Sequence, residues 1–234
     1  MIKIKNLTKK FNHHFVIDGI SLEIKEGEKL AVIGPSGCGK STLLRLLIGL
    51  ENPTGGEIEI DGKIVHKLEE EGLIKLRQGI GMVFQSSALF DSLTVGENVA
   101  FALREHTHKS EREIKEIVAR KLELVDLSGK DDLMPSELSG GMQKRVSIAR
   151  ALAFDPKIIL YDEPTTGLDP LTSITIEKLI NKIAKETGAT SVIVTHQVTT
   201  ILRTATRIIM LDRGKLIDSD RPVVKQFLEA GKEI

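Results

Sequence analysis

The sequence predicts an α/β fold that is built around a phosphate-binding loop and carries an antiparallel β layer and a helical segment. Residues 34–42 match the pattern G-x-x-x-x-G-K-[ST] at every fixed position. The apolar run 30–33 before them is typical of a buried parallel strand, and the largely apolar residues 43–50 predict a helix. Alternating apolar and polar residues at 2–5, 21–24 and 57–60 predict the strands of the β layer.

A strand, a glycine-rich turn and a helix start together form an anion site. Glycines let the backbone curl so that successive N–H groups face phosphate oxygens, and the helix N-terminus adds partial positive charge. We expect Lys40 to reach the β- and γ-phosphates of ATP and the Ser41 hydroxyl to ligate Mg²⁺. An ordinary glycine and serine turn is the alternative, which the full pattern disfavours. The predicted ATP-binding residues of this loop are Gly34, Pro35, Ser36, Gly37, Cys38, Gly39, Lys40, Ser41 and Thr42.

The composition limits the class of protein. A length of 234 residues allows one large domain or two small ones, and a formal net charge of +0 gives no bulk attraction to nucleic acid. The single cysteine excludes an internal disulfide, which suits a reducing cytoplasm. No apolar run approaches the roughly 20 residues that span a bilayer, and the N-terminus does not resemble a signal peptide. We therefore expect any role at a membrane to depend on a partner.

Polar residues follow three more apolar runs. Gln85 follows 80–84, Asp162 and Glu163 end 158–163, and His196 follows 191–195. Ligands bind at strand ends in α/β sheets. Gln85 could ligate Mg²⁺ and contact the attacking water, Asp162 could hold Mg²⁺ through water, and Glu163 could polarise the water. His196 could hydrogen-bond the γ-phosphate. The alternatives are a loop start for Gln85, a solvated loop for the two acids and a structural role for the histidine.

From Val95 to Phe154 the pattern is mostly helical. Residues 111–126 carry an apolar stripe at spacings of three and four. A second serine and glycine turn, 138–143, precedes a helix at 144–153, so it is either a second phosphate cradle or ordinary helix capping. Residues 172–185 predict a helix, 207–217 a hairpin, and 222–230 a final helix.

Two aromatic residues near the N-terminus are candidates for stacking on adenine. Phe11 offers a π-surface that needs no specific hydrogen bond, and Phe15 competes with it. A core phenylalanine is the alternative.

Several motifs match those of one family in order and spacing: the phosphate loop, Gln85, residues 138–142, Asp162 with Glu163, Asp169 and His196. The sequence resembles the nucleotide-binding subunit of ATP-binding cassette (ABC) transporters over essentially its whole length. The resemblance implies the P-loop NTPase fold of ABC ATPases, as a single domain over 1–234. It places the α/β core at 1–85 and 155–234, and a helical insertion at 86–154.

The resemblance also implies a head-to-tail homodimer that hydrolyses ATP. ATP on the phosphate loop of one subunit would be sealed by the signature residues of the other, and Asp169 would signal between the two sites. Phe11 stands where many members have tyrosine. Met142 stands where the commonest signature has glutamine, which is displaced here to Gln143. The implied signature residues are Ser139, Gly140, Gly141 and Met142.

A narrower resemblance rests on residues 84–90, 103–107 and 133–142. These segments look like the Mla/Mce-type phospholipid-transport ATPases, a group that shares Met142. The implied partners are an integral membrane permease, an Mce-domain protein and a regulatory subunit, with no nucleic acid, at the cytoplasmic face of the inner membrane. One rival is the ATPase of an importer for a small solute such as a polar amino acid. Another is a soluble, non-transport ABC protein.

Two further expectations concern single residues. Cys38 lies beside a helix N-terminus, which predicts a favoured thiolate. The apolar residues Leu89, Phe90 and Phe101 lie near the start of the implied insertion. We expect some of them to form a pocket for a short cytoplasmic helix of the permease.

Overall fold

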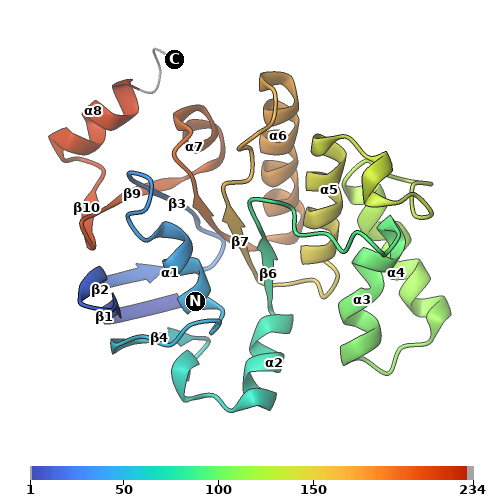
Figure 1. Ribbon diagram of the computed structural model, residues 1–234, viewed down its shortest axis with the longest axis horizontal. Helices are drawn as coiled ribbons and strands as arrows, with labels where there is room; N and C mark the ends of the chain where they lie inside the picture. The colour runs from blue at the N-terminus through green and yellow to red at the C-terminus, as the bar shows by residue number, and fades with distance from the viewer. Residues whose placement is uncertain (1, 231–234) are drawn as a thin grey trace. The chain divides into compact units, whose positions relative to one another are not determined.

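The computed structural model describes residues 2–230 of the chain (Figure 1). Contacts group the chain into two compact units. The first contains the described residues of Met1–Gln78 and Thr190–Ile234, and the second is Gly79–Ala189. The predicted site residues are divided between them: the phosphate loop and His196 belong to the first unit, and Gln85, Asp162 and Glu163 to the second.

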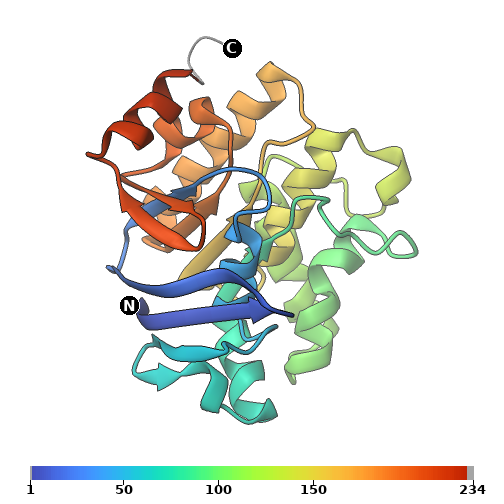
Figure 2. The same ribbon diagram turned by 60° about the vertical axis from the view of Figure 1, so that its left-hand side comes forward.

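The first unit contains the predicted antiparallel layer, with strand order β2-β1-β4-β5 (Figure 2). The strands are β1 (Ile2–Phe11), β2 (His14–Ile24), β4 (Gly55–Ile60) and β5 (Lys63–Ile64). The alternation in the sequence buries Ile2 and Ile4 at one face. β1 is longer than the predicted 2–5, because it stays paired with β2 through register irregularities as far as Phe11, which lies opposite His14.

The same unit contains four strands in the order β10-β9-β3-β8. They are β3 (Lys29–Ile33), β8 (Thr190–Val194), β9 (Arg207–Asp212) and β10 (Lys215–Asp218). β3 is parallel to both β8 and β9, and its residues 30–33 are fully buried, as the apolar run predicts. β9 and β10 form the predicted hairpin. The phosphate loop therefore leaves the carboxyl edge of a buried strand that has a parallel neighbour on each side.

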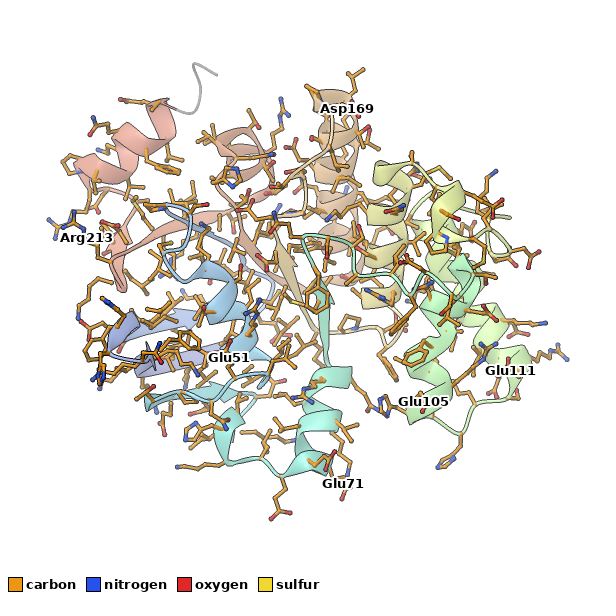
Figure 3. All side chains as sticks on the ribbon, viewed as in Figure 1. Glu51, Glu71, Glu105, Glu111, Asp169 and Arg213 are labelled. Carbon is orange, nitrogen blue, oxygen red and sulfur yellow. The ribbon has the colours of Figure 1, made fainter. Side chains whose placement is uncertain are left out.

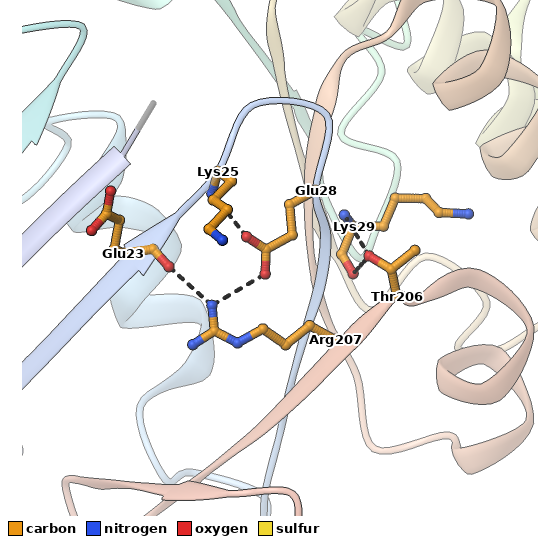
Figure 4. A network of polar contacts seen from close by, with 6 residues as sticks. All are labelled: Glu23, Lys25, Glu28, Lys29, Thr206 and Arg207. Carbon is orange, nitrogen blue, oxygen red and sulfur yellow. Dashed lines mark hydrogen bonds and ion pairs between the residues drawn. The ribbon is translucent and has the colours of Figure 1, made fainter.

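Polar contacts fix the start of β3 beside β9 (Figure 4). Glu28 accepts a hydrogen bond from the Lys25 backbone N–H at 2.8 Å and pairs with Arg207 at 3.2 Å. Arg207 also donates to the Glu23 carbonyl at 3.0 Å. The Thr206 backbone N–H and hydroxyl both donate to the Lys29 carbonyl, at 2.8 and 3.1 Å. These contacts set the register of the two strands upstream of the phosphate loop.

The helices of the first unit are α1 (Lys40–Leu47), α2 (Glu70–Gln78), α7 (Val198–Thr204) and α8 (Pro222–Ala230). The predicted final helix, α8, buries Val224 in a cluster with Ala31, Ile33, Ile201 and Met210. α1 begins three residues before the predicted 43–50, directly at Lys40. α2 and α7 are short helices that no sequence pattern predicted.

The second unit pairs β6 (Ile80–Val83) in parallel with β7 (Ile158–Asp162), with Val83 opposite Tyr161. Its helices are α3 (Val95–His106), α4 (Glu111–Leu124), α5 (Gly140–Ala151) and α6 (Pro170–Thr187), and a 3₁₀ turn spans Pro135–Glu137. Capping boxes at Thr94 and Ser110 start α3 and α4. Between residues 2 and 230, no helix is long and apolar enough to cross a membrane.

Candidate functional site

The phosphate loop has the predicted strand, turn and helix context. β3 ends at Ile33 and α1 begins at Lys40, so residues 34–39 form the connection. The Lys40 side chain is buried, and its Nζ donates to the carbonyls of Gly34 and Pro35 at 2.9 and 3.0 Å. The ammonium group therefore lies within the curl of the loop, where an anion bound by the loop would meet it.

Two glycines of the loop are required by close contacts. A Cβ on Gly34, whose φ is 148°, would lie 2.1 Å from the Leu211 carbonyl oxygen of β9. A Cβ on Gly39, whose φ is 107°, would lie 2.7 Å from Val16 Cγ1 and 2.9 Å from the Val16 carbonyl oxygen. Both contacts involve backbone atoms of neighbouring strands, which cannot swing away as a flexible side chain can. The loop thus has this path because its glycines let it pass so close to β2 and β9.

The prediction of a favoured thiolate at Cys38 is wrong. Partial burial raises the pKa of the Cys38 thiol, and the opposing attraction of Lys40 does not compensate. Asp212 raises the pKa further by charge repulsion. Proximity to a helix N-terminus lowers a thiol pKa only where the thiol keeps its hydration, and this thiol loses part of it.

His196 and the candidate stacking residues also belong to the first unit. β8 pairs in parallel with β3, with Val194 opposite Val32, so exposed His196 follows the same sheet edge as the phosphate loop. Phe11 and Phe15 are 44% and 47% exposed. Lys9 Nζ lies 4.8 Å from the Phe11 ring centroid, and Lys10 Nζ lies 4.0 Å from that of Phe15. Neither ring is core, so both remain candidates for stacking on a base.

In the second unit, the two carboxylates and Gln85 follow paired parallel strands. Asp162 ends β7, while Gln85 comes two residues after the end of β6, so both follow the same sheet edge. Asp162 and Glu163 are 9% and 8% exposed. Glu163 has a φ of 48°, unusual for a residue with a side chain, and its Oε2 accepts a hydrogen bond from Thr166 Oγ1 at 3.0 Å. Backbone strain of this kind persists where surrounding structure fixes a functional group.

The turn before α5 is a helix cap in this structure. Ser139 Oγ accepts a hydrogen bond from the Met142 backbone N–H at 3.3 Å, so α5 begins at Gly140 rather than at the predicted 144. A Cβ on Gly141 would lie 2.4 Å from Thr172 Cγ2, which explains a glycine where α5 approaches α6. Gln143, the glutamine that follows Met142, donates a hydrogen bond from its side-chain amide to the Pro135 carbonyl at 3.0 Å. Its side chain is thus bound to the 3₁₀ turn that precedes α5. Ser139 and Gly140 are both exposed.

Asp169 caps α6, where it is labelled in Figure 3. Its Oδ1 accepts hydrogen bonds from the backbone N–H groups of Leu171 and Thr172, both at 3.0 Å. Hydrogen bonds from Thr172 are the main reason that the pKa of Asp169 lies below its usual value. The geometry gives this residue a local structural role beside its predicted signalling role.

Three polar side chains of the second unit hold loop backbone in contacts that the sequence does not predict. Lys144 and Arg150 of α5 donate hydrogen bonds to backbone carbonyls within residues 84–88. The side-chain amide of Asn98 in α3 donates hydrogen bonds to backbone carbonyls within residues 90–94. Burial lowers the pKa of Lys144 to about 8, and nearby Asp162 opposes this shift. No sequence pattern identifies these contacts, because each joins a side chain to backbone that is distant along the chain or in a loop.

The residues predicted to ligate Mg²⁺ offer oxygen atoms only: the Ser41 hydroxyl, the Gln85 amide and the Asp162 carboxylate. Mg²⁺ prefers such donors, and beside phosphates it uses few protein ligands. Within residues 2–230, no group of three or more His, Cys, Asp or Glu side chains forms a metal cage. The donor set therefore suits a metal shared with nucleotide phosphates.

Comparison with known proteins decides the family. The family model described as ABC transporter matches residues 17–166, which include the phosphate loop, Gln85, residues 138–142 and both carboxylates. The chain belongs to the ABC transporter family. It is therefore an ATP-binding and ATP-hydrolysing subunit, as the resemblance implied.

Relatives and solved structures agree on this class. The chain is 45% identical over 205 residues to the intermembrane phospholipid transport system ATP-binding protein MlaF of Haemophilus influenzae, covering 88% of this chain and 78% of that protein. It is 43% identical to the methionine import ATP-binding protein MetN of Carboxydothermus hydrogenoformans, covering 97% and 71%. A dimeric ATP-binding cassette in a post-hydrolysis state with ADP and Pi superimposes with a TM-score of 0.84 at 38% identity, covering 93% and 98%.

Proposed function

We propose that this ABC ATPase powers the transport of phospholipid between membranes, from the cytoplasmic face of the inner membrane and through a permease. The observation that carries the proposal is the similarity to MlaF, together with the resemblance of residues 84–90, 103–107 and 133–142 to lipid-transport ATPases. The MetN relative supports the rival, an importer of a small solute such as an amino acid.

Within each subunit, we assign the phosphate loop and Lys40 to the phosphates of ATP. Lys40 is already held inside the loop by two carbonyls, so it needs little rearrangement to meet a phosphate. Ser41, Gln85 and Asp162 would hold Mg²⁺, which neutralises charge on the phosphates when bound. Glu163 polarises the attacking water and His196 hydrogen-bonds the γ-phosphate. Phe11 stacks on the adenine, with Phe15 as the alternative.

Two copies of the chain form the active assembly in this proposal. Ser139, Gly140, Gly141 and Met142 of one copy bind the ATP held by the other. Ser139 and Gly140 are exposed at the N-terminus of α5, where backbone N–H groups favour an anion. Asp169 would pass the state of one site to the other.

We also propose that the permease docks on Phe90 and Phe101. Their side chains are 44% and 41% exposed, with ring centroids 4.7 Å apart. Exposed aromatic pairs are typical anchors for a short helix of a partner. Leu89, which precedes Phe90 in the chain, is half-buried. In Phe90→Asp we expect loss of co-purification with the permease at an unchanged melting temperature, whereas Leu202→Asp, at another exposed apolar residue, should keep binding.

The substrate is tested by reconstituting the chain with its permease in vesicles. ATP should drive transfer of a fluorescent phospholipid to acceptor membranes and no uptake of labelled methionine. Glu163→Gln should lower ATP turnover by roughly two orders of magnitude while ATP still binds, because it removes the carboxylate and keeps the shape. Glu186→Gln, at an exposed carboxylate of α6, is the matched control. Methionine uptake without lipid transfer would favour the importer instead.

A further inference from the structure

The loop after β6 has an unusual backbone. Ser87 and Ala88 have φ values of 62° and 47°, two successive left-handed residues with side chains. Each such residue is less stable than one in an ordinary backbone conformation, because its Cβ approaches the following carbonyl oxygen. Neither is glycine or asparagine, the residues that adopt this conformation most easily. Contacts from elsewhere must therefore hold the loop in this shape.

Two cations of α5 make those contacts. Lys144 Nζ donates to the carbonyls of Phe84 and Gln85, at 3.0 and 2.7 Å. Arg150 donates to the carbonyls of Ser87 and Ala88, at 2.9 and 2.7 Å. Hydrogen bonds from charged donors contribute about twice as much as neutral ones. Four of the five carbonyls from Phe84 to Ala88 are thus held by one helix.

Burial adds to the effect of this clamp, which we define as Lys144 and Arg150 with the carbonyls of residues 84, 85, 87 and 88. Lys144 is 2% exposed, so water cannot replace its hydrogen bonds without opening the structure. The Arg150 guanidinium carbon also lies 5.9 Å from the Phe90 ring centroid. The clamp therefore extends from Gln85 toward the exposed aromatic pair.

We propose that Lys144 and Arg150 are positioning residues for ATP hydrolysis, which hold the backbone around Gln85 so that its side chain is placed to act. This inference rests on the proposed role of Gln85. The same helix carries Ser139 as its cap and Gly141 in its first turn. The clamp consequently joins the signature end of α5 to the Gln85 loop, so that the two move together.

The test compares three variants of the full chain, each with the donor replaced by an apolar side chain of similar length. Lys144→Met and Arg150→Met remove the clamp. Arg145→Met is the matched control, because Arg145 of the same helix donates to the carbonyls of Val125 and Asp126 instead, at 3.5 and 3.3 Å. The measurements are kcat and KM for ATP, and amide hydrogen exchange of peptides covering residues 85–90.

We expect kcat to fall at least roughly tenfold in Lys144→Met and Arg150→Met, since displacing a catalytic group by about 1 Å can cost a hundredfold. KM should stay within about twofold, because the phosphate loop that binds ATP is unchanged. Exchange at residues 85–90 should accelerate in both variants and not in Arg145→Met. Arg150→Lys, which keeps a charged donor, should recover part of kcat.

Two results separate the inference from the proposed role of Gln85. If Gln85→Ala lowers kcat but both clamp variants keep it, the clamp does not position Gln85 and the inference is overturned. If Gln85→Ala leaves kcat unchanged, the proposed role of Gln85 itself is wrong. If Lys144→Met does not fold, Arg150→Met decides, since Arg150 is less buried and its loss leaves Lys144 in place.

Discussion

Gly34→Ala should disrupt the phosphate loop by a steric clash rather than by backbone strain alone. The new Cβ would lie 2.1 Å from the Leu211 carbonyl oxygen and 2.9 Å from Cys38 Sγ. A relaxed carbon–oxygen contact is roughly 3.3 Å, so the loop or β9 must move by about 1 Å. Losing one hydrogen bond between the loop and a charged phosphate costs about 1.5–3 kcal/mol. We therefore expect the Kd for ATP to rise at least about tenfold.

Gly62→Ala separates the clash from the strain. Gly62 also has a positive φ, 78°, in the same unit, but a Cβ there would meet nothing within 4 Å. It should lose about 1–2 kcal/mol of stability from strain and bind ATP normally. The assay is binding of a fluorescent ATP analogue together with thermal melting of both variants. Equal ATP affinity in Gly34→Ala and wild type would refute the steric argument for this loop.

Three other predictions use single side chains. Tyr161→Phe should raise stability by about 1 kcal/mol in urea unfolding, because the buried Tyr161 hydroxyl has no hydrogen-bond partner within residues 2–230; a loss of stability would contradict this. Asp169→Asn should lower the free energy of unfolding at neutral pH. Because the pKa of Asp169 is lower in the folded chain than in the unfolded chain, its carboxylate stabilises the fold at pH values above the unfolded-state pKa. In wild type this stabilisation should be lost as the pH falls through the folded-state pKa. Alkylation of Cys38 by iodoacetamide should be slower at pH 7 than that of a free thiol and accelerate with rising pH, since burial raises its pKa; a rate already constant above pH 7 would contradict it.

Local pattern determined much of the fold. The apolar run 30–33 and the loop pattern after it predicted a buried strand, a turn and a helix, and the structure has all three. The hairpin β9–β10 and the final helix were predicted at nearly their observed ends. These predictions were confirmed because they depend only on residues that are close together in the chain: an apolar run, a glycine that can adopt positive φ, and a helical spacing of apolar residues.

Boundaries depended on capping and pairing that short patterns do not contain. β1 continues past the alternating 2–5 because β2 supplies partners up to Phe11. α5 starts at Gly140 because Ser139 caps it, although two glycines disfavour a helix by propensity. Hydrogen bonds from another strand or a capping side chain offset such preferences.

The family motifs by themselves determined the class of protein and the candidate residues. Only the tertiary structure decided how those residues are supported: the close approach of Gly34 to β9, the burial that raises the pKa of Cys38, and the clamp of Lys144 and Arg150 on the Gln85 loop. The physical reason is the distance along the chain between the residues that interact. A motif records which groups the chemistry needs within a few residues, whereas desolvation, steric contact and side-chain bonds to distant backbone arise only when segments far apart in the chain are packed together.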